Sequence, residues 1–375
     1  MILNILHVIE NLEIGGAQIR LINDLKFMDR EKINSIVCSL KGNGKLVKEI
    51  TDLGIKTYTL GGFCHFSSFV KFAKIIIENN IDIIHTHLFF ADLYGRLFGK
   101  LLGVPTVIST IQSSVYEPDN NYLYSFKRKL LDKYSANFCN KKFIAVSEFV
   151  KISINKRLKI DADKIEVIPN YIDFDQFKEI NQHKIATLKK ELNLNPRGIV
   201  LITVGRLNPA KGVDYLLEAF SYLLVEHKNI KLFIVGDGPS RESLKDLSIS
   251  LGLKERVMFL GERDDVKELL HISDIFVFPT LSEGMPLGLL EALAVGKPCV
   301  ASDIGPIREV IQDGIKGGLL FKAENSTDLA RVINELVRDP VYAKHLGDKG
   351  IDILRDKFNP IDKAKMLEDL YLSLK

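Results

Sequence analysis

The sequence predicts an α/β protein built from two Rossmann-like domains that face each other, and three observations lead to this class. The chain has 375 residues, of which 46% are hydrophobic and 26% charged, so it can bury more than one core and is too apolar for disorder. Short apolar runs alternate with longer helical patterns, which is typical of parallel sheets with helical crossovers. This alternation restarts after about residue 195.

The expected strands fall into two series that flank this restart. The first series comprises "NILHVI", "INSIVCSL", "DIIHTH", "TVIST", "FIAVS" and "IEVIP". The second comprises "IVLITVGR", "KLFIVGDG", "VMFLG", "IFVFPT", "PCVAS" and "GGLLF". Ligands of such sheets bind at the carboxyl ends of the strands, so we expect a site in a central cleft between two such ends.

The domain boundary is expected within 167–177, "VIPNYIDFDQF", because its Pro-Asn pair is a turn signal. We therefore predict an N-terminal domain at 1–174 and a C-terminal domain at 175–355. The remaining segment, 356–375, contains a helical pattern after Pro360 and is expected to pack back on the N-terminal domain.

Composition excludes several classes of protein. A net charge of +3 gives no argument for binding nucleic acid. The four scattered cysteines fit reduced thiols, and the N-terminus "MILNILHVIE" is typical of a first strand rather than of a signal peptide. No apolar run reaches the roughly 18 residues of a spanning helix. We expect a cytoplasmic protein.

The segment 281–298, "LSEGMPLGLLEALAVGKP", places two glutamates among apolar and small residues. Pro286 suits the first turn of a helix, and the Gly and Pro near the end suit its stop, so a helix is expected over about 286–295. Glu283 then precedes the helix and Glu291 lies within it. The helix start favours an anion, and the carboxylates can accept hydrogen bonds from sugar or ribose hydroxyls. A capping acid and a solvated helix face are the structural alternatives.

Two cations follow another strand, in "LITVGRLNPAKGVDYLLEAF". Arg206 and Lys211 lie in the loop after Gly205, just before a helix that is expected near Asp214. A guanidinium and an ammonium group beside a strand end can form a diphosphate site, although ordinary loop cations are equally compatible. The pattern of a Walker loop is absent.

Glycines mark two further strand ends. Gly236 and Gly238 begin a dinucleotide fingerprint that fails at Arg241, so we interpret them as a tight turn near a nucleotide. Gly15 and Gly16 lie between the first strand and a helix, where they allow close backbone approach to a phosphate or sugar; a simple tight turn is the alternative.

Some histidines and aspartates are candidate metal ligands. His85 and His87 share a face of one strand, but no neighbouring Cys or third His completes a set, so we expect one of them to point into the cleft; packing in the core is the alternative. The Asp-x-Asp strings at 161–163 and 173–175 lie in polar turns, where Asp is favoured for other reasons. We expect no metal site.

The segment 127–159 carries ten Lys and Arg residues against two acidic residues. Its first part mixes aromatics, leucines and cations, which is typical of a surface that attracts anionic lipid. A solvated basic helix is the alternative. We expect peripheral contact with the inner face of a membrane.

Taken together, the chain resembles the retaining GT-B glycosyltransferases, in particular glycosyltransferase family 4. The resemblance covers nearly the full length, and the order and spacing of "GRLNPAKG", "VGDGP", "FLG" and "EGMPLGLLEALAVGKPCVAS" carry it. The two glutamates form the E-x7-E pattern of the family's signature. The resemblance implies two Rossmann-like domains, an N-terminal one for the acceptor and a C-terminal one for a nucleotide-sugar donor.

The resemblance also implies residue roles. Arg206 and Lys211 would bind the donor diphosphate, Glu291 the ribose hydroxyls, and Glu283 a hydroxyl of the transferred sugar; Arg206, Lys211 and Glu283 would be catalytic. The nucleotide base of the donor would lie near Gly236 and the loop 259–263. The full expected donor set is Gly16, Gly205, Arg206, Lys211, Gly236, Gly261, Arg263, Glu283, Gly284, Met285, Pro286, Leu287, Gly288 and Glu291. His87 and Gln112 are expected on the acceptor side.

Gln112 is a departure from the family pattern, because many members carry a histidine in this loop. Gln cannot take a proton at neutral pH, which argues against a general base there. In the family mechanism the leaving phosphate oxygen takes the acceptor's proton, and no cofactor is implied. We expect transfer of a hexose or N-acetylhexosamine, with UDP as the expected carrier, to a glycan or lipid-linked acceptor in surface polysaccharide or glycoconjugate synthesis. A glycoside hydrolase, a nucleotide-sugar epimerase and a non-catalytic nucleotide-binding module are the alternatives.

Overall fold

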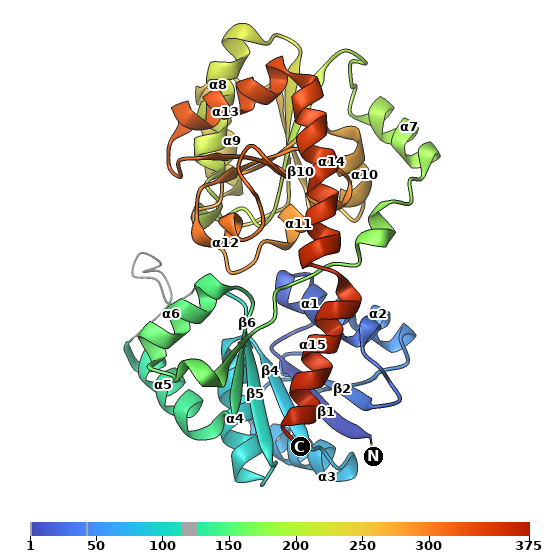
Figure 1. The fold of residues 1–375 in the computed structure, drawn as a ribbon, viewed down its shortest axis with the longest axis vertical. Helices are drawn as coiled ribbons and strands as arrows, with labels where there is room; N and C mark the ends of the chain where they lie inside the picture. Colours follow the sequence, from blue (N-terminus) through green and yellow to red (C-terminus); the bar gives the residue numbers. More distant parts are fainter. Residues whose placement is uncertain (1, 43, 114–125) are drawn as a thin grey trace. The chain divides into compact units, whose positions relative to one another are not determined.

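The computed structural model describes residues 2–42, 44–113 and 126–375, and the chain forms two compact units (Figure 1). The first unit contains Met1–Tyr171 together with Asn359–Lys375, and the second contains Ile172–Phe358. The chain therefore passes between the units twice. Both divisions lie within three residues of the expected boundaries at 174 and 355.

The first unit is built on a seven-stranded parallel sheet with the order β3-β2-β1-β4-β5-β6-β7. Its strands are β1 (Leu3–Ile9), β2 (Ile33–Ser39), β3 (Lys56–Thr59), β4 (Ile83–His87), β5 (Thr106–Ile111), β6 (Lys142–Ala145) and β7 (Ile165–Val167). All six predicted strands are confirmed. The sequence analysis missed β3, a four-residue edge strand without a fully buried residue, so it carries no apolar run.

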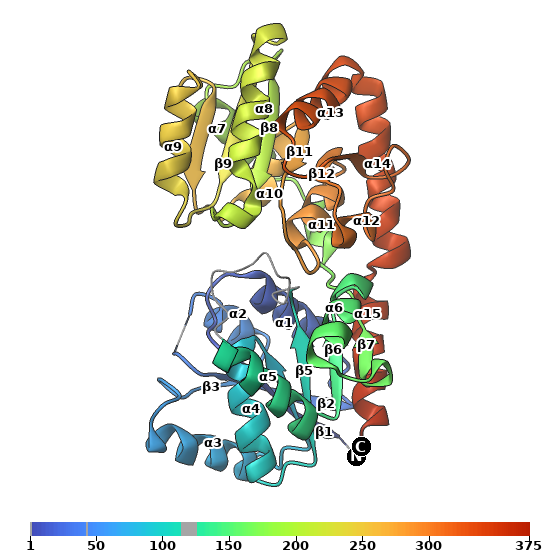
Figure 2. The same cartoon turned by 90° about the vertical axis from the view of Figure 1, so that its left-hand side faces the viewer.

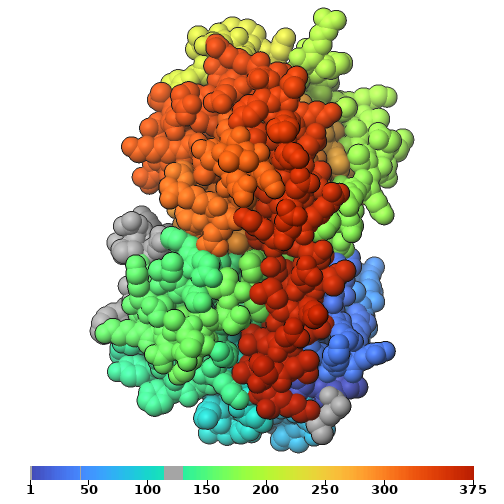
Figure 3. All heavy atoms as spheres, in the orientation of Figure 1, coloured from blue at the N-terminus to red at the C-terminus, as the bar shows by residue number. Residues whose placement is uncertain are grey.

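Helices cover both faces of this sheet. They are α1 (Gly16–Phe27), α2 (Val47–Asp52), α3 (Phe66–Glu78), α4 (Phe89–Leu101), α5 (Phe126–Cys139), α6 (Glu148–Leu158) and α15 (Pro360–Ser373), with the 3-10 turn η1 (Ala162–Lys164). The C-terminal helix α15 lies against the blue and green segments of this unit (Figure 3). Its Leu367 and Tyr371 join Leu3, Ile5 and Ile108 in one buried cluster. This burial of the α15 apolar face explains why the chain returns to the first unit.

The second unit has a six-stranded parallel sheet with the order β10-β9-β8-β11-β12-β13. Its strands are β8 (Ile199–Val204), β9 (Ile230–Val235), β10 (Val257–Gly261), β11 (Ile275–Phe278), β12 (Cys299–Ser302) and β13 (Gly318–Phe321). The sequence predicts every one of them, because a strand that helices cover on both faces is a short apolar run.

The helices of the second unit are α7 (Gln182–Glu191), α8 (Val213–Glu226), α9 (Arg241–Ser250), α10 (Val266–Ile272), α11 (Leu287–Ala294), α12 (Gly305–Arg308), α13 (Ser326–Arg338) and α14 (Pro340–Lys357), with the turns η2 (Phe174–Phe177) and η3 (Pro209–Lys211). Helices α8, α9 and α13 pack on one face of the sheet, and α10, α11 and α14 lie on the other (Figure 2). The α/β class with two Rossmann-like units is thus confirmed.

Each sheet has one point where the strand order reverses. In the first unit this point lies between β1 and β4, and in the second between β8 and β11. At such a point the loops that follow the two strands leave in opposite directions and open a crevice at the carboxyl edge. The loops after β8 and β11 contain Arg206, Lys211 and Glu283, and Glu291 lies in the helix that follows β11, α11.

Two further expectations concern the whole chain. Among the helices of the described residues, none combines the length and apolar character that crossing a bilayer requires. All four cysteines are free, with Cys38 and Cys299 buried and Cys64 exposed.

Candidate active site at the strand-order reversal of the second unit

The loops after β8 and β11 are fastened to each other by backbone contacts. The Leu281 N–H donates to the carbonyl of Ala210 at 2.8 Å, and the Thr280 hydroxyl donates to the same carbonyl at 3.1 Å. These bonds hold the loop that carries Lys211 against the loop that carries Glu283. Residues that are 72 positions apart in sequence are therefore brought to one place.

Glycine is required at two points of this arrangement. Gly212 has φ +60°, and a Cβ atom there would lie 2.2 Å from the carbonyl oxygen of Pro279. Gly236 has φ +122°, and its Cβ would lie 2.0 Å from the carbonyl oxygen of Gly205. Larger residues would force the loops after β8, β9 and β11 apart. The glycines therefore bring three loops close together rather than merely turning the chain.

Lys211 and Glu283 form an ion pair between the ammonium Nζ and the carboxylate Oε1. Their side chains are 24% and 14% exposed, so the pair lies at the rim of the unit and is partly shielded from solvent. The Lys211 ammonium also lies 5.7 Å from the ring centroid of Phe278 at the end of β11. A carboxylate and a π-face thus hold one ammonium group in position.

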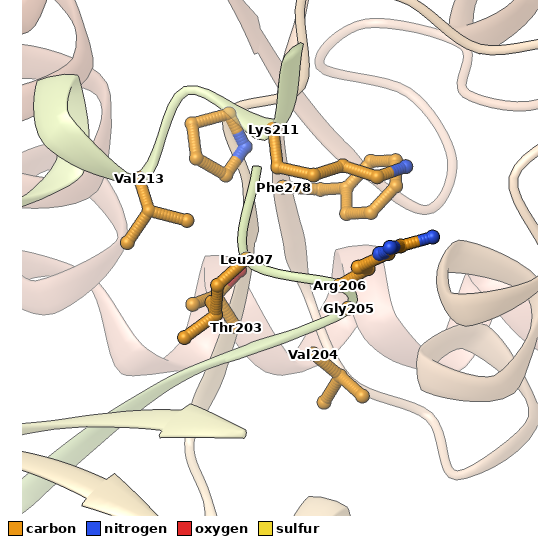
Figure 4. Close-up of a pocket in the computed structure, with 9 residues that line it drawn as sticks. Thr203, Val204, Gly205, Arg206, Leu207, Lys211, Val213 and Phe278 are labelled. Carbon is orange, nitrogen blue, oxygen red and sulfur yellow. The ribbon is translucent and has the colours of Figure 1, made fainter. Parts of the chain in front are cut away.

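Arg206 extends from the end of β8 in the same direction as Lys211 (Figure 4). Its side chain is exposed, and no carboxylate within the described ranges pairs with it. Both residues line one pocket, together with Gly205, Phe278 and Pro279. Two cations that project side by side, one of them uncompensated, can bind a doubly charged anion such as a diphosphate.

Helix α11 starts at Leu287 with Pro286 as its N-cap, one residue inside the predicted start. Gly284, Met285, Pro286 and Leu287 are buried, and Gly288 is partly exposed in the first turn. The first turn of an α-helix leaves N–H groups without helical partners and carries positive potential. The helix therefore adds a further source of positive potential to the site that Arg206 and Lys211 form.

Glu291 lies within α11, and its environment differs from that of Glu283. Burial raises the pKa of Glu291 to about 7 from an ordinary value of 4.5. Between these pH values the folded protein holds a proton that the unfolded chain has lost. The group therefore favours folding fully only below about pH 4.5, and this contribution is lost as pH rises through 7.

We expect Glu291→Gln to remove this dependence. Relative to the variant, the wild type should lose about 2 kcal/mol of unfolding free energy between pH 5 and pH 8. This is less than the full pKa shift would give, because the side chain retains contact with solvent. Urea unfolding of both proteins across this pH range measures the difference. Parallel stability curves would show that Glu291 does not titrate as its burial implies.

The remaining expected donor residues occupy different environments. The carbonyl of Gly261, at the end of β10, accepts the Gly236 N–H at 2.7 Å, so these two glycines lie together. Arg263 forms a bidentate contact with Asp265, at 2.8 and 2.7 Å, and a longer contact with Glu191. In this structure the Arg263 guanidinium is bound to these carboxylates, and its role in binding the sugar donor stays a prediction. Gly16 opens α1 in the first unit and is exposed.

The histidines of the first unit correct two expectations. His85 and His87 are both fully buried, so the expectation that one of them points into the cleft is wrong and the alternative, packing in the core, holds. A third histidine, His7 on the neighbouring strand β1, completes a cluster whose potential ligand atoms all lie within 4.8 Å of one another. The local pattern around His85 does not reveal it, because His7 lies on a distant part of the chain. A direct acceptor contact for His87 stays a prediction that this burial disfavours.

The hydrogen bonds within this cluster are those expected of neutral imidazoles in a protein core. His85 contacts the Tyr371 hydroxyl through Nδ1 and the Thr110 hydroxyl through Nε2, each at 2.6 Å. His7 Nδ1 and His87 Nε2 are 3.3 Å apart. Burial lowers the pKa of His7 to about 3 and those of His85 and His87 well below their ordinary value. Because both nitrogens of His85 are engaged, it could become a metal ligand only by breaking one of these bonds.

The Asp-x-Asp strings do not gather into a ligand set. In the part of the chain that the structure describes, neither string belongs to a group of three potential metal ligands. Asp161 lies 3.9 Å from Lys164, and Asp175 pairs with Lys178 at 2.5 Å. These local pairs support the interpretation of both strings as polar turns.

Two residues at the carboxyl ends of strands, one in each unit, escaped the sequence analysis. Phe278, under the Lys211 ammonium, is the last residue of a strand that leads into the glutamate loop, and its place at the strand end is the signal that could have found it. Leu88, directly after β4, has φ 73° and ψ 156°, a conformation that costs a non-glycine residue about 1–3 kcal/mol. Nothing in a leucine indicates such strain.

The basic segment is only partly described. The side chains of Lys127, Arg128 and Lys129 lie outside the described residues. Further along α5, the apolar side chains of Leu131, Tyr134 and Phe138 are exposed, and so is Leu130.

Comparisons with known proteins show the family of this chain. The model of Glycosyltransferase Family 4 matches residues 14–176, and the model of Glycosyl transferases group 1 matches residues 184–352. The chain is therefore a glycosyltransferase. It belongs to the GT-B glycosyltransferases of family 4, whose two domain models together account for both of its units.

Individual relatives share most of the chain. UDP-Gal:alpha-D-GlcNAc-diphosphoundecaprenol alpha-1,3-galactosyltransferase of Escherichia coli is 29% identical over 96% of this chain and 94% of its own length. N-acetyl-alpha-D-glucosaminyl L-malate synthase of Bacillus anthracis is 28% identical over 80% of this chain and 77% of its own.

Solved structures share the fold. Anabaena Alr3699/HepE, crystallised with UDP-glucose, matches with a TM-score of 0.87 at 22% identity, over 99% of each chain. Sucrose-phosphate synthase of Thermosynechococcus elongatus matches with a TM-score of 0.82 at 20% identity, also over 99% of each chain.

Proposed function

We propose that this glycosyltransferase moves a hexose or N-acetylhexosamine from a UDP-sugar to a glycan or lipid-linked acceptor, with retention of configuration. One observation carries the donor half of this proposal. Arg206 and Lys211 project together at the reversal point of the second sheet, with Glu283 bound to Lys211. This arrangement offers positive charge for a diphosphate and a hydrogen-bond acceptor beside it.

The names of relatives support the substrate class. The Escherichia coli relative is named for UDP-Gal and a diphosphoundecaprenol-linked GlcNAc. Another relative, 28% identical, is alpha-monoglucosyldiacylglycerol synthase of Streptococcus pneumoniae. A UDP-sugar donor and a lipid-linked acceptor for synthesis of a surface polysaccharide or glycoconjugate are therefore the substrates that we propose for this chain.

The proposed mechanism assigns each charged group a role. The bond between the sugar's anomeric carbon and the diphosphate breaks, and negative charge builds on the leaving phosphate. Arg206 and Lys211 stabilise that charge, and electrostatic stabilisation of this kind is usually the largest single contribution to catalysis. The acceptor hydroxyl attacks the same face and passes its proton to the leaving phosphate oxygen. Glu283 accepts a hydrogen bond from the transferred sugar, and Glu291 from the ribose.

We also propose that the reaction needs no metal ion. Metal-dependent transferases neutralise the diphosphate with a divalent cation, whereas here the two side-chain cations and the start of α11 can supply that charge. Activity that persists unchanged in a chelator would support this proposal, and activity that is lost with chelator and restored by a divalent ion would overturn it.

A donor panel tests the function. The purified protein is incubated with UDP-, GDP- and ADP-sugars in the presence and absence of lipid-linked sugar acceptors, and released nucleoside diphosphate is measured. Release that requires both one donor and one acceptor supports transfer. Conversion of the donor alone to an epimer, or cleavage of a glycoside without nucleotide, would instead favour the epimerase or the hydrolase.

The acceptor half includes a proposed membrane contact. Phe138 of α5 is 78% exposed and Leu131 is 51% exposed, within a segment rich in lysine and arginine. Apolar side chains among cations favour anionic bilayers, because the former insert and the latter bind headgroups.

We expect Leu131→Glu together with Phe138→Glu to weaken binding to anionic phospholipid vesicles about tenfold or more, since two inserting groups become charged. Neutralising Lys127, Arg128 and Lys129 should have a similar effect. Cosedimentation measures the binding, and Val225→Glu, an exposed apolar residue of the second unit, is the matched control. Equal binding by all variants would contradict the proposed contact.

A further inference from the structure

We propose that Arg20 and Asn170 are positioning residues that fix the side-chain amide of Gln112, so that its NH2 group is the one presented to an oxygen of a bound sugar. The inference rests on the proposed function and adds to it a contact and the means by which that contact is oriented. All three residues belong to the first unit.

Arg20 is the fixed point of this arrangement. It lies in α1, is 1% exposed, and donates through Nε to Asp24 at 2.7 Å. Its Nη1 group donates to the carbonyl of Pro169 at 2.7 Å and to that of Ile168 at 3.3 Å. A buried charge with this many partners cannot turn away without leaving several of them unpaired.

The polarity of the next two groups follows from Arg20. Arginine has only donors, so the atom of Asn170 that it contacts, at 3.1 Å, must be the acceptor Oδ1. The amide nitrogen of Asn170 then faces Gln112, which it contacts at 3.1 Å. The atom of Gln112 in that contact must be its acceptor, Oε1. A guanidinium thus determines which end of the Gln112 amide is turned inward.

The amide nitrogen of Gln112 is the end that these contacts leave for a ligand. Gln112 Nε2 is buried, and among the described residues it has no hydrogen-bond partner. A buried donor without a partner is costly, and a hydroxyl or other oxygen of a ligand would satisfy it. Gln112 follows β5. In the register of the sheet, Thr110 of β5 pairs with His87 at the end of β4, and His87 pairs with Ile9 at the end of β1. The NH2 group therefore lies at the carboxyl edge of the sheet, beside its reversal point.

Asn170→Asp is the sharpest test, because it keeps the size of the side chain and replaces the donor by a carboxylate oxygen, whose negative charge lies beside the Arg20 guanidinium. The new carboxylate can still accept from Arg20, but it cannot donate to Gln112, so the amide of Gln112 must turn and present its oxygen to the sugar. We expect kcat/KM for transfer to fall about tenfold, as for Gln112→Ala, while the thermal midpoint stays close to that of the wild type.

A double-mutant cycle separates positioning from a structural role. If Asn170 acts through Gln112, Asn170→Asp should have less than about a twofold further effect in a Gln112→Ala background. Equal losses in both backgrounds, or an unchanged rate in the single variant, would overturn the proposal. Asn23→Ala is the control, since Asn23 donates to the carbonyl of Tyr171 at 2.9 Å, a similar tie to the same segment that does not reach Gln112.

Two further readouts identify the sugar and keep this test separate from the proposed function. If the NH2 group contacts the donor sugar, slow hydrolysis of the donor without acceptor should fall in Asn170→Asp together with transfer; if it contacts the acceptor, only transfer should fall. Either result supports the proposal. A wild type that turns over no donor in the panel would refute the proposed function, whereas an Asn170→Asp variant that transfers sugar as well as the wild type does would refute only this inference.

Discussion

Lys211→Ala is expected to reduce kcat/KM for sugar transfer by about 10²–10³-fold, which corresponds to about 2.7–4 kcal/mol of lost charge stabilisation. The ammonium is held by Glu283 and the face of Phe278, so it needs no rearrangement when charge builds on the leaving phosphate. Steady-state release of UDP with donor and acceptor measures the loss. Affinity for UDP should fall in the same variant, because the ammonium contacts the diphosphate before and during the reaction.

The matched control for this change is Lys245→Ala. Lys245 pairs with Glu242 at 2.8 Å in the same unit, so its removal also breaks a lysine–glutamate pair but lies outside the site. Both variants should unfold cooperatively at temperatures close to that of the wild type, since pairs at a surface contribute little to stability. Near-normal turnover by Lys211→Ala, or an equal loss in Lys245→Ala, would contradict the assigned role.

Glu283→Gln is expected to weaken the contact with the transferred sugar without weakening the binding of UDP. The neutral amide loses the charge-assisted hydrogen bond to the transferred sugar, worth about 1.5–3 kcal/mol, and kcat/KM for transfer should fall about 10–100-fold. The same change removes the counterion of Lys211 and frees the ammonium for phosphate. UDP, which lacks the sugar, should therefore bind at least as tightly as it does to the wild type.

Calorimetric titration with UDP and kinetics with the UDP-sugar measure these opposite responses. Glu242→Gln, which removes the counterion of Lys245, serves as the control and should alter neither quantity. If UDP affinity and transfer fell together in Glu283→Gln, the glutamate would be a structural support for the loop rather than a contact to the sugar.

Much of the fold follows from local pattern in the sequence, and the exceptions have physical causes. The strands that helices cover on both faces are apolar runs, and each lies where its pattern predicts it. Strand β3 lies at an edge and has no fully buried residue. Its pairing with β2 depends on tertiary structure and cannot be predicted from its own four residues. The start of α11 follows from Pro286 because its ring suits the beginning of a helix.

The site is less accessible to prediction, because its contacts join distant parts of the chain. Resemblance to a family brings Lys211 and Glu283 into one hypothesis, but their ion pair depends on the backbone bonds that Ala210 accepts. His7 could not be assigned to His85 and His87, since strand order alone places them together. The tie from Arg20 to Asn170 joins residues 150 positions apart and, like the next contact to Gln112, is visible only in the folded chain.

A crystal structure with UDP bound tests the central claim most directly, namely that Arg206 and Lys211 bind the donor diphosphate at the strand-order reversal of the second unit. We expect the guanidinium of Arg206 and the ammonium of Lys211 to lie within hydrogen-bond distance of phosphate oxygens, with the Glu291 carboxylate on the ribose. Phosphates bound elsewhere, with both cations directed away from them, would contradict the account.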